Sequence, residues 1–104
     1  AIPRTNRYTE RFGRWMRTLR DPVAEAHIAR RIARLAEGNP GQHRVLDGGV
    51  AELKIDHGPG YRVYYTERGP EIVVLLIGGT KKTQAVDIAT AQAMRKALAS
   101  DTEQ

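Results

Sequence analysis

Residues 52–84 read ELKIDHGPGYRVYYTERGPEIVVLLIGGTKKTQ, and the pattern of this stretch decides which class of fold the chain can adopt. The segments 50–57 and 61–66 alternate in character and flank a Gly-Pro-Gly turn, so we expect them to be paired strands. The apolar run over 72–77 is typical of a strand that is covered on both faces or lies centrally in a sheet. The stretch therefore predicts the centre of a mostly antiparallel sheet.

The register of the turn decides which side chains of the two paired strands meet. If the loop is 58–60, or differs from it by two residues, even-numbered positions share one face and odd-numbered positions share the other. A four-residue loop would mix polar with apolar side chains on both faces, which burial penalises, so we expect the first register. Helices then cover the odd-numbered face. The polar face carries Glu52, Lys54, Asp56, Arg62, Tyr64 and Thr66, and the apolar face carries Leu53, Ile55, Val63 and Tyr65.

Upstream of these strands, the chain has the apolar spacing of two amphipathic helices, over 10–19 and 22–37. Thr9 is the expected N-cap of the first helix. Asp21 and Pro22 open the second as an N-cap followed by proline at the first helical position, and Gly38 suits its C-terminal cap. The expected buried positions are Phe12, Trp15, Met16 and Leu19 on the first helix and Ala24, Ile28, Ile32 and Leu35 on the second.

The remaining segments complete an α+β architecture. We expect short strands at 6–9 and 43–47, a glycine pair that ends the apolar strand, and a last helix over 83–98. The resulting order is β-α-α-β-β-β-β-α, a helical hairpin packed on a mostly antiparallel four- to five-stranded sheet. A chain of 104 residues is expected to form one domain, 1–104, with residues 1–5 and 99–104 frayed.

Composition narrows the functional classes. The chain has no cysteine, which excludes disulfides, thiol catalysis and thiolate metal sites. Its three histidines lack metal-ligand spacing, so we expect neither a metal nor a cofactor. No apolar run approaches the ~20 residues that span a bilayer, and the first residues lack a stretch typical of signal peptides. We therefore expect a cytoplasmic protein with no membrane partner.

The basic charge is concentrated at the start of the chain. The net charge is +5, but residues 1–34 alone carry nine arginines and three acidic residues, a net of +6. Such a patch favours a polyanion, either nucleic acid or an acidic protein segment, although a solvated basic surface explains it equally well. The expected ridge consists of Arg7, Arg11, Arg14 and Arg17, joined by Arg30, Arg31 and Arg34 on the second helix.

The polar face of the paired strands is the candidate site for chemistry. Arg62 offers a planar fork for two phosphate oxygens, and Lys54 is a candidate base beside it. Lys81 and Lys82 follow the central strand, where they can stabilise charge or supply a proton, and Tyr64 shares the face. The alternative is a salt-bridged surface, pairing Lys54 with Glu52 or Arg62 with Asp56, worth about 0–1 kcal/mol per pair.

Several motifs give the chain a family resemblance, which extends from about Tyr8 to Leu98. They are FxxW at 12–15, LRDPVAEAHIARRIARLAEGNPG at 19–41, ELKIDHGPGYRVYY at 52–65 and LLIGGTKKTQAVDI at 75–88. These stretches resemble the RelE/ParE superfamily of toxins, and within it the HigB-like branch of addiction-module killer proteins. The fold of that superfamily agrees with the order of elements expected above.

The resemblance implies a bacterial type II toxin with defined partners. RelE-like members cleave mRNA in the ribosome through the substrate's own 2′-hydroxyl, without a metal, and thereby inhibit translation and arrest growth. An antitoxin, expected to be a small helix-turn-helix protein, neutralises them. Carried across by motif, Arg62 matches the transition-state arginine, Lys54 a strand lysine proposed as base, and Lys82 or Lys81 a second basic position. The residues expected to contact RNA are Arg7, Arg11, Arg14, Arg17, Arg30, Arg31, Arg34 and Gln84.

Other functions remain open from the sequence. ParE-like members of the superfamily poison DNA gyrase without nuclease activity, and a basic nucleic-acid-binding module without catalysis is a third possibility. Ile88 stands about where RelE has a tyrosine, and the His, Asp and Tyr set of some HigB toxins has no counterpart here. The general acid is therefore unassigned. Retention of Lys54, Arg62 and the pair Lys81 and Lys82 favours the nuclease.

Overall fold

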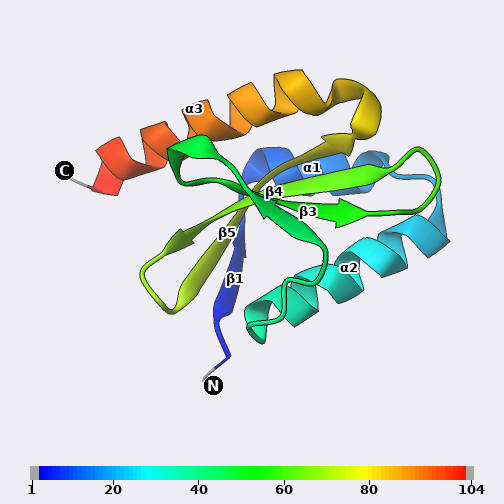
Figure 1. Ribbon diagram of the computed structural model, residues 1–104, viewed down its shortest axis with the longest axis horizontal. Coiled ribbons are helices and arrows are strands. Elements are labelled where there is room, and N and C mark those ends of the chain that lie inside the picture. The colour runs from blue at the N-terminus through cyan, green and yellow to red at the C-terminus, as the bar shows by residue number, and fades with distance from the viewer. Residues whose placement is uncertain (1–2, 103–104) are drawn as a thin grey trace.

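A five-stranded sheet lies between helices in the computed structural model, which describes residues 3–102, with side chains described for 3–98 (Figure 1). The α+β architecture and the predicted order of elements are confirmed. In chain order the elements are β1 (Thr5–Tyr8), α1 (Glu10–Thr18), α2 (Pro22–Ala36), β2 (His43–Val45), the short 3₁₀ turn η1 (Asp47–Gly49), β3 (Ala51–Ile55), β4 (Tyr61–Arg68), β5 (Ile72–Thr80), the 3₁₀ turn η2 (Lys81–Thr83) and α3 (Gln84–Thr102).

The strands are arranged in the order β1-β5-β4-β3-β2. Only β1 runs parallel to its neighbour, β5, so the sheet is mostly antiparallel, as predicted. Across the hairpin of β3 and β4, Lys54 lies opposite Arg62 and Glu52 lies opposite Tyr64. This pairing confirms the register expected from the alternation of side chains.

Helices α1 and α2 begin and end where local chemistry predicts. The hydroxyl of Thr9 accepts a hydrogen bond of 3.0 Å from the backbone N–H of Phe12, which caps α1. The carboxylate of Asp21 caps α2 by accepting from the backbone of Val23 and Ala24. Gly38 follows α2 with a φ of +90°, a left-handed conformation that ends a helix and favours glycine. The two helices therefore start at fixed points over the sheet.

The odd-numbered face of the sheet packs against α1 and α2. Leu53, Val63 and Leu75 are fully buried there, at 0% exposure. The predicted helical residues that complete this core are Phe12, Ala24, Ile28, Ile32 and Leu35, with Trp15, Met16 and Leu19 partly buried beside them. The apolar face expected from the sequence is thus confirmed.

The even-numbered face is also covered, by α3 along β4 and β5. A second core forms there from Val50, Tyr64, Val74, Leu76, Ile77 and Ala91. The prediction that β5 is apolar because both its faces are covered is confirmed. The register placed Tyr64 on the polar face of β3 and β4, and α3 lies over it there.

The glycine pair after the apolar run continues β5 instead of ending it. A Cβ at Gly78 would lie 2.2 Å from Cε3 of Trp15, and one at Gly79 would lie 1.9 Å from Oδ2 of Asp87. Only glycine lets α1 and α3 approach the two faces of the strand so closely. Steric contact, rather than a turn, therefore explains the pair.

At the ends of the described chain, Thr5 belongs to β1 and α3 continues to Thr102. The fraying expected at residues 1–5 and 99–104 stays a prediction. Residues 1–2 and 103–104 lie outside the described residues. Among residues 3–102, no helix has the length and apolar character needed to cross a bilayer.

Candidate active site

A cavity of about 420 Å³ opens where the hairpin of β3 and β4 meets β2 and the start of α3. Four residues predicted to form the site, Lys54, Arg62, Lys81 and Gln84, line it together. The structure thus brings together side chains from two strands, the end of β5 and a helix. The other lining residues are Gln42, His43, Arg44 and Glu52.

Arg62 is the chemically unusual member of the cavity. Its side chain belongs to a residue that is only 3% exposed, and its Nη1 donates to the carbonyl of Tyr61 at 3.1 Å. Its Nε has no hydrogen-bond partner among the described residues. A buried cation with an unpaired donor destabilises the fold. A charge-assisted hydrogen bond that the guanidinium donates to an anion would remove this desolvation penalty. The cavity is therefore suited to an anionic ligand.

Glu52 connects three elements around the cavity. It is 2% exposed, and its Oε2 accepts a hydrogen bond of 2.9 Å from Nε2 of Gln84. Its Oε1 lies 3.3 Å from Nη2 of Arg44 on β2. The expected pairing of Glu52 with Lys54 is therefore replaced by pairing with Arg44 and Gln84. The amide of Gln84, predicted to contact RNA, is bonded to this carboxylate.

Tyr64 lies beneath the cavity and does not line it. Its side chain is fully buried under α3, and its hydroxyl has no hydrogen-bond partner among the described residues. Burial, and then the nearby carboxylate of Glu52, raise the pKa of Tyr64. The phenol therefore stays protonated over the physiological range, and its part in the reaction stays a prediction.

The three lysines differ in how they relate to the cavity. Lys54 is exposed at the rim, and its backbone is held by a 3.0 Å bond from its N–H to the carbonyl of Gln42. The backbone N–H of Lys81 donates to the carbonyl of Gly60 at 2.7 Å, which ties the end of β5 to the hairpin turn. Lys82 is exposed and is not among the lining residues. Of the predicted pair, Lys81 is the one at the site.

Two of the predicted RNA-binding arginines lie elsewhere than expected. Arg31 donates to the carbonyls of Lys54, Pro40 and Gln42 at 2.6, 3.0 and 2.7 Å, so its guanidinium holds the loop after α2 against β3. Burial, and then the charge of Arg34, lower the pKa of Arg31. Arg7 is on β1 opposite Val74, on the face that α3 covers, and not on the α1 ridge.

The other arginines of this group form an exposed basic surface on the far side of the sheet from the cavity. They belong to α1 and α2, which pack on the odd-numbered face, whereas Lys54 and Arg62 stand on the even-numbered face. The structure therefore separates the basic helices from the cavity. These residues are Arg11, Arg14, Arg17, Arg30 and Arg34.

Sequence reasoning missed the contribution of β2 and gave Glu52 only a surface role. Arg44 lies opposite Glu52 across β2 and β3, with His43 and Gln42 beside it at the cavity. The segment 43–47 was predicted as a strand, but its neighbour in the sheet was not. Had that pairing been assumed, an arginine opposite a glutamate would have been the available signal. Among the described side chains, those of residues 3–98, no three metal-ligating groups form a cluster.

Comparison with known proteins agrees with this architecture. The family model described as "Phage derived protein Gp49-like" matches residues 14–99. An uncharacterized protein of Haemophilus influenzae is 41% identical over 87 residues, which cover 84% of this chain and 88% of that protein. The E. coli toxin RelE, solved in the free state with two arginines changed to alanine, has a TM-score of 0.70 and 18% identity. That match covers 90% of this chain and 98% of the other, so the two proteins share a fold.

Proposed function

Because the chain belongs to the Gp49-like family of phage-derived proteins and has the fold of the toxin RelE, we propose that it is the toxin of a type II toxin–antitoxin system. Its proposed activity is metal-independent cleavage of mRNA on the ribosome, which inhibits translation. The observation that carries this proposal is the unpaired Nε of buried Arg62 in a cavity that also holds Lys54 and Lys81.

In the proposed reaction, the substrate's 2′-hydroxyl oxygen bonds to the adjacent phosphorus as the bond from phosphorus to the 5′-oxygen breaks. Arg62 donates to the phosphate oxygens on which negative charge builds up. We assign uptake of the 2′-hydroxyl proton to Lys54 and delivery of a proton to the leaving 5′-oxygen to Lys81. The products are a cyclic phosphate and a free 5′-hydroxyl, so atoms and protons balance.

The basic helices support the proposed ribosome dependence. The exposed arginines of α1 and α2 lie on the opposite side of the sheet from the cavity, where they are available to phosphates of a second RNA. A protein with this charge distribution can hold ribosomal RNA with one face and mRNA with the other. We further propose that an antitoxin, expected to be a small helix-turn-helix protein, neutralises it.

Primer extension on cellular transcripts tests this function. On induction, we expect growth arrest and discrete cuts within translated codons, and we expect Arg62→Ala to abolish both while leaving the circular dichroism spectrum unchanged. Arg20→Ala, at an exposed arginine outside those assigned to RNA contact, serves as a control for loss of one positive charge. Full toxicity of Arg62→Ala would show that the cavity is not the site of the reaction. Intact transcripts together with a DNA-damage response would instead favour the gyrase inhibitor.

A further inference from the structure

The turn between β3 and β4 lies against two residues that line the active-site cavity, Arg62 and Lys81. Gly60 has a φ of +81°, and a Cβ there would lie 3.4 Å from Nη1 of Arg62 and 3.5 Å from Cβ of Lys81. The carbonyl of Gly60 also accepts the backbone N–H of Lys81 at 2.7 Å. Any movement of this turn would therefore change the surroundings of the Arg62 guanidinium directly.

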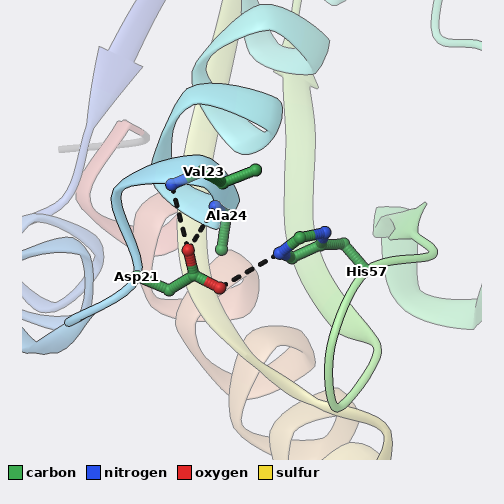
Figure 2. A network of polar contacts seen from close by, with 4 residues as sticks. All are labelled: Asp21, Val23, Ala24 and His57. Carbon is green, nitrogen blue, oxygen red and sulfur yellow. Dashed lines mark hydrogen bonds and ion pairs between the residues drawn. The ribbon is translucent and has the colours of Figure 1, made fainter.

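The other side of the same turn is fastened to the start of α2 by a side-chain contact (Figure 2). Nε2 of His57 lies 3.0 Å from Oδ2 of Asp21, while Oδ1 of Asp21 accepts the backbone N–H groups of Val23 and Ala24 at 3.0 and 3.2 Å. One carboxylate thus caps the helix and holds the histidine. Because the backbone N–H of Gly60 donates to the carbonyl of His57 at 3.0 Å, a single hydrogen bond connects the residue held by Asp21 to the glycine beside the Arg62 guanidinium.

We infer that His57 is a positioning residue for Arg62, acting through the turn that it fastens to Asp21. The inference deepens the proposed function and rests on it for any effect on RNA cleavage, but the geometric coupling itself does not. His57 touches neither the cavity nor the reacting atoms. It sets how firmly Gly60 is held beside the guanidinium.

The strength of this fastening depends on pH. Histidine changes its charge between about pH 5 and 8, and a protonated imidazole adds electrostatic attraction to the hydrogen bond that it donates to a carboxylate. The hydrogen bond from His57, then those from the backbone of the cap, lower the pKa of Asp21, so its carboxylate stays ionised over this range. The contact between His57 and Asp21 is therefore stronger at the acid end of this pH range.

One neighbouring group opposes that trend. The ring of His27, on α2, lies 5.1 Å from the ring of His57, and two protonated imidazoles at this distance repel each other. Asp56 precedes His57 within the turn and adds a negative charge. The titratable groups near His57 thus come from the turn before α2, from α2 itself and from its own loop.

Nitrogen-15 NMR of the Arg62 Nε–H group tests the inference without any substrate, with the signal assigned by its loss in Arg62→Lys. In the wild type, we expect this resonance to shift with pH along the same midpoint as the ring signals of His57. In His57→Gln and in Asp21→Ser, we expect the pH dependence to disappear. Serine keeps the N-cap of α2, so Asp21→Ser removes the contact without removing the cap.

The control variant is Glu25→Gln, which neutralises another carboxylate in the first turn of α2 and should leave the shift intact. The double variant Asp21→Ser/His57→Gln should behave like either single variant. An Arg62 resonance that does not follow the titration of His57, or that follows pH unchanged in both single variants, would overturn the inference.

Cleavage of mRNA by the same variants separates this inference from the proposed function. We expect His57→Gln to slow cleavage about ten- to hundredfold, as small displacements of a catalytic group do, and to flatten the pH profile of the rate. If the wild type cleaves no RNA while the Arg62 resonance still follows His57, the proposed function fails and the coupling stands. If the wild type cleaves RNA and His57→Gln retains the full rate and pH profile, the positioning role is wrong.

Discussion

The two faces of the hairpin formed by β3 and β4 are built from alternating residues of the same two strands but meet opposite requirements. On the odd-numbered face, Leu53 and Val63 are completely buried against α1 and α2. On the even-numbered face, Arg62 and Tyr64 are also buried, yet each has a polar atom with no hydrogen-bond partner among the described residues. One face of the hairpin thus stabilises the fold through apolar packing, whereas the other keeps polar groups that a ligand can satisfy.

The largest expected effect comes from breaking the apolar face. Leu53→Ala should lower the free energy of unfolding by about 2–5 kcal/mol, because it opens a cavity in a packed core. Urea denaturation measures this change. RNA cleavage per folded molecule should be retained, because Leu53 points away from Arg62. A loss of cleavage greater than the loss of folded protein would show that the two faces are not independent.

The reverse result is expected on the polar face. Arg62→Leu should reduce cleavage by about 10²–10³-fold, as loss of a donor to a transition-state oxyanion does, but leave the free energy of unfolding unchanged or higher. Denaturation and primer extension on the same variant measure the two effects. Arg31→Leu is the matched contrast. It leaves three carbonyls without their hydrogen-bond donor and should therefore destabilise the fold. Destabilisation of Arg62→Leu as large as that of Arg31→Leu would contradict the assignment.

The approach of α3 to the even-numbered face is tested by a smaller change. Gly79→Ala places a methyl group against Asp87, and we expect it to cost about 1–3 kcal/mol of stability and to shift the start of α3. Because Gln84 begins that helix and bonds to Glu52, cleavage should fall as well. Gly69→Ala is the control, since a Cβ there meets no atom within 4 Å and only its φ of +63° is strained. Equal loss of cleavage in both variants would exclude a specific role for α3.

The apolar face was predictable because its signal is local and repeated. The alternation of Leu53, Ile55, Val63 and Tyr65 determines the hairpin register, and that register alone placed Lys54 opposite Arg62. Helix caps at Thr9 and Asp21 are equally local. Such features depend on neighbours in sequence, so one chain is enough to infer them.

The rest of the site depends on contacts between distant segments, which no periodicity encodes. Burial of Tyr64 requires knowing that α3 folds back over β4, and the bonds of Glu52 require that β2 pairs with β3. Arginine is a residue type that often binds RNA, yet the guanidinium of Arg31 donates to three backbone carbonyls of the protein itself. The sequence identified residues that line one cavity, Lys54, Arg62, Lys81 and Gln84, but not which of their polar groups stay unpaired.

The smallest expected effect is on Tyr64, whose buried hydroxyl has no partner. Tyr64→Phe should raise the free energy of unfolding near neutral pH by at most about 0.5–1.5 kcal/mol and should leave cleavage intact.

The same variant should change how stability depends on pH. Since the folded protein raises the pKa of Tyr64, the stability contributed by its neutral phenol is fully present below the unfolded pKa of about 10 and is lost as pH rises above it. The variant should therefore lose less stability between neutral and strongly alkaline pH, as measured by urea denaturation. Tyr65, whose pKa burial also raises, still titrates and supplies the residual slope. Loss of cleavage in Tyr64→Phe would show that the phenol takes part in the reaction. Tyr64 would then not serve the fold alone.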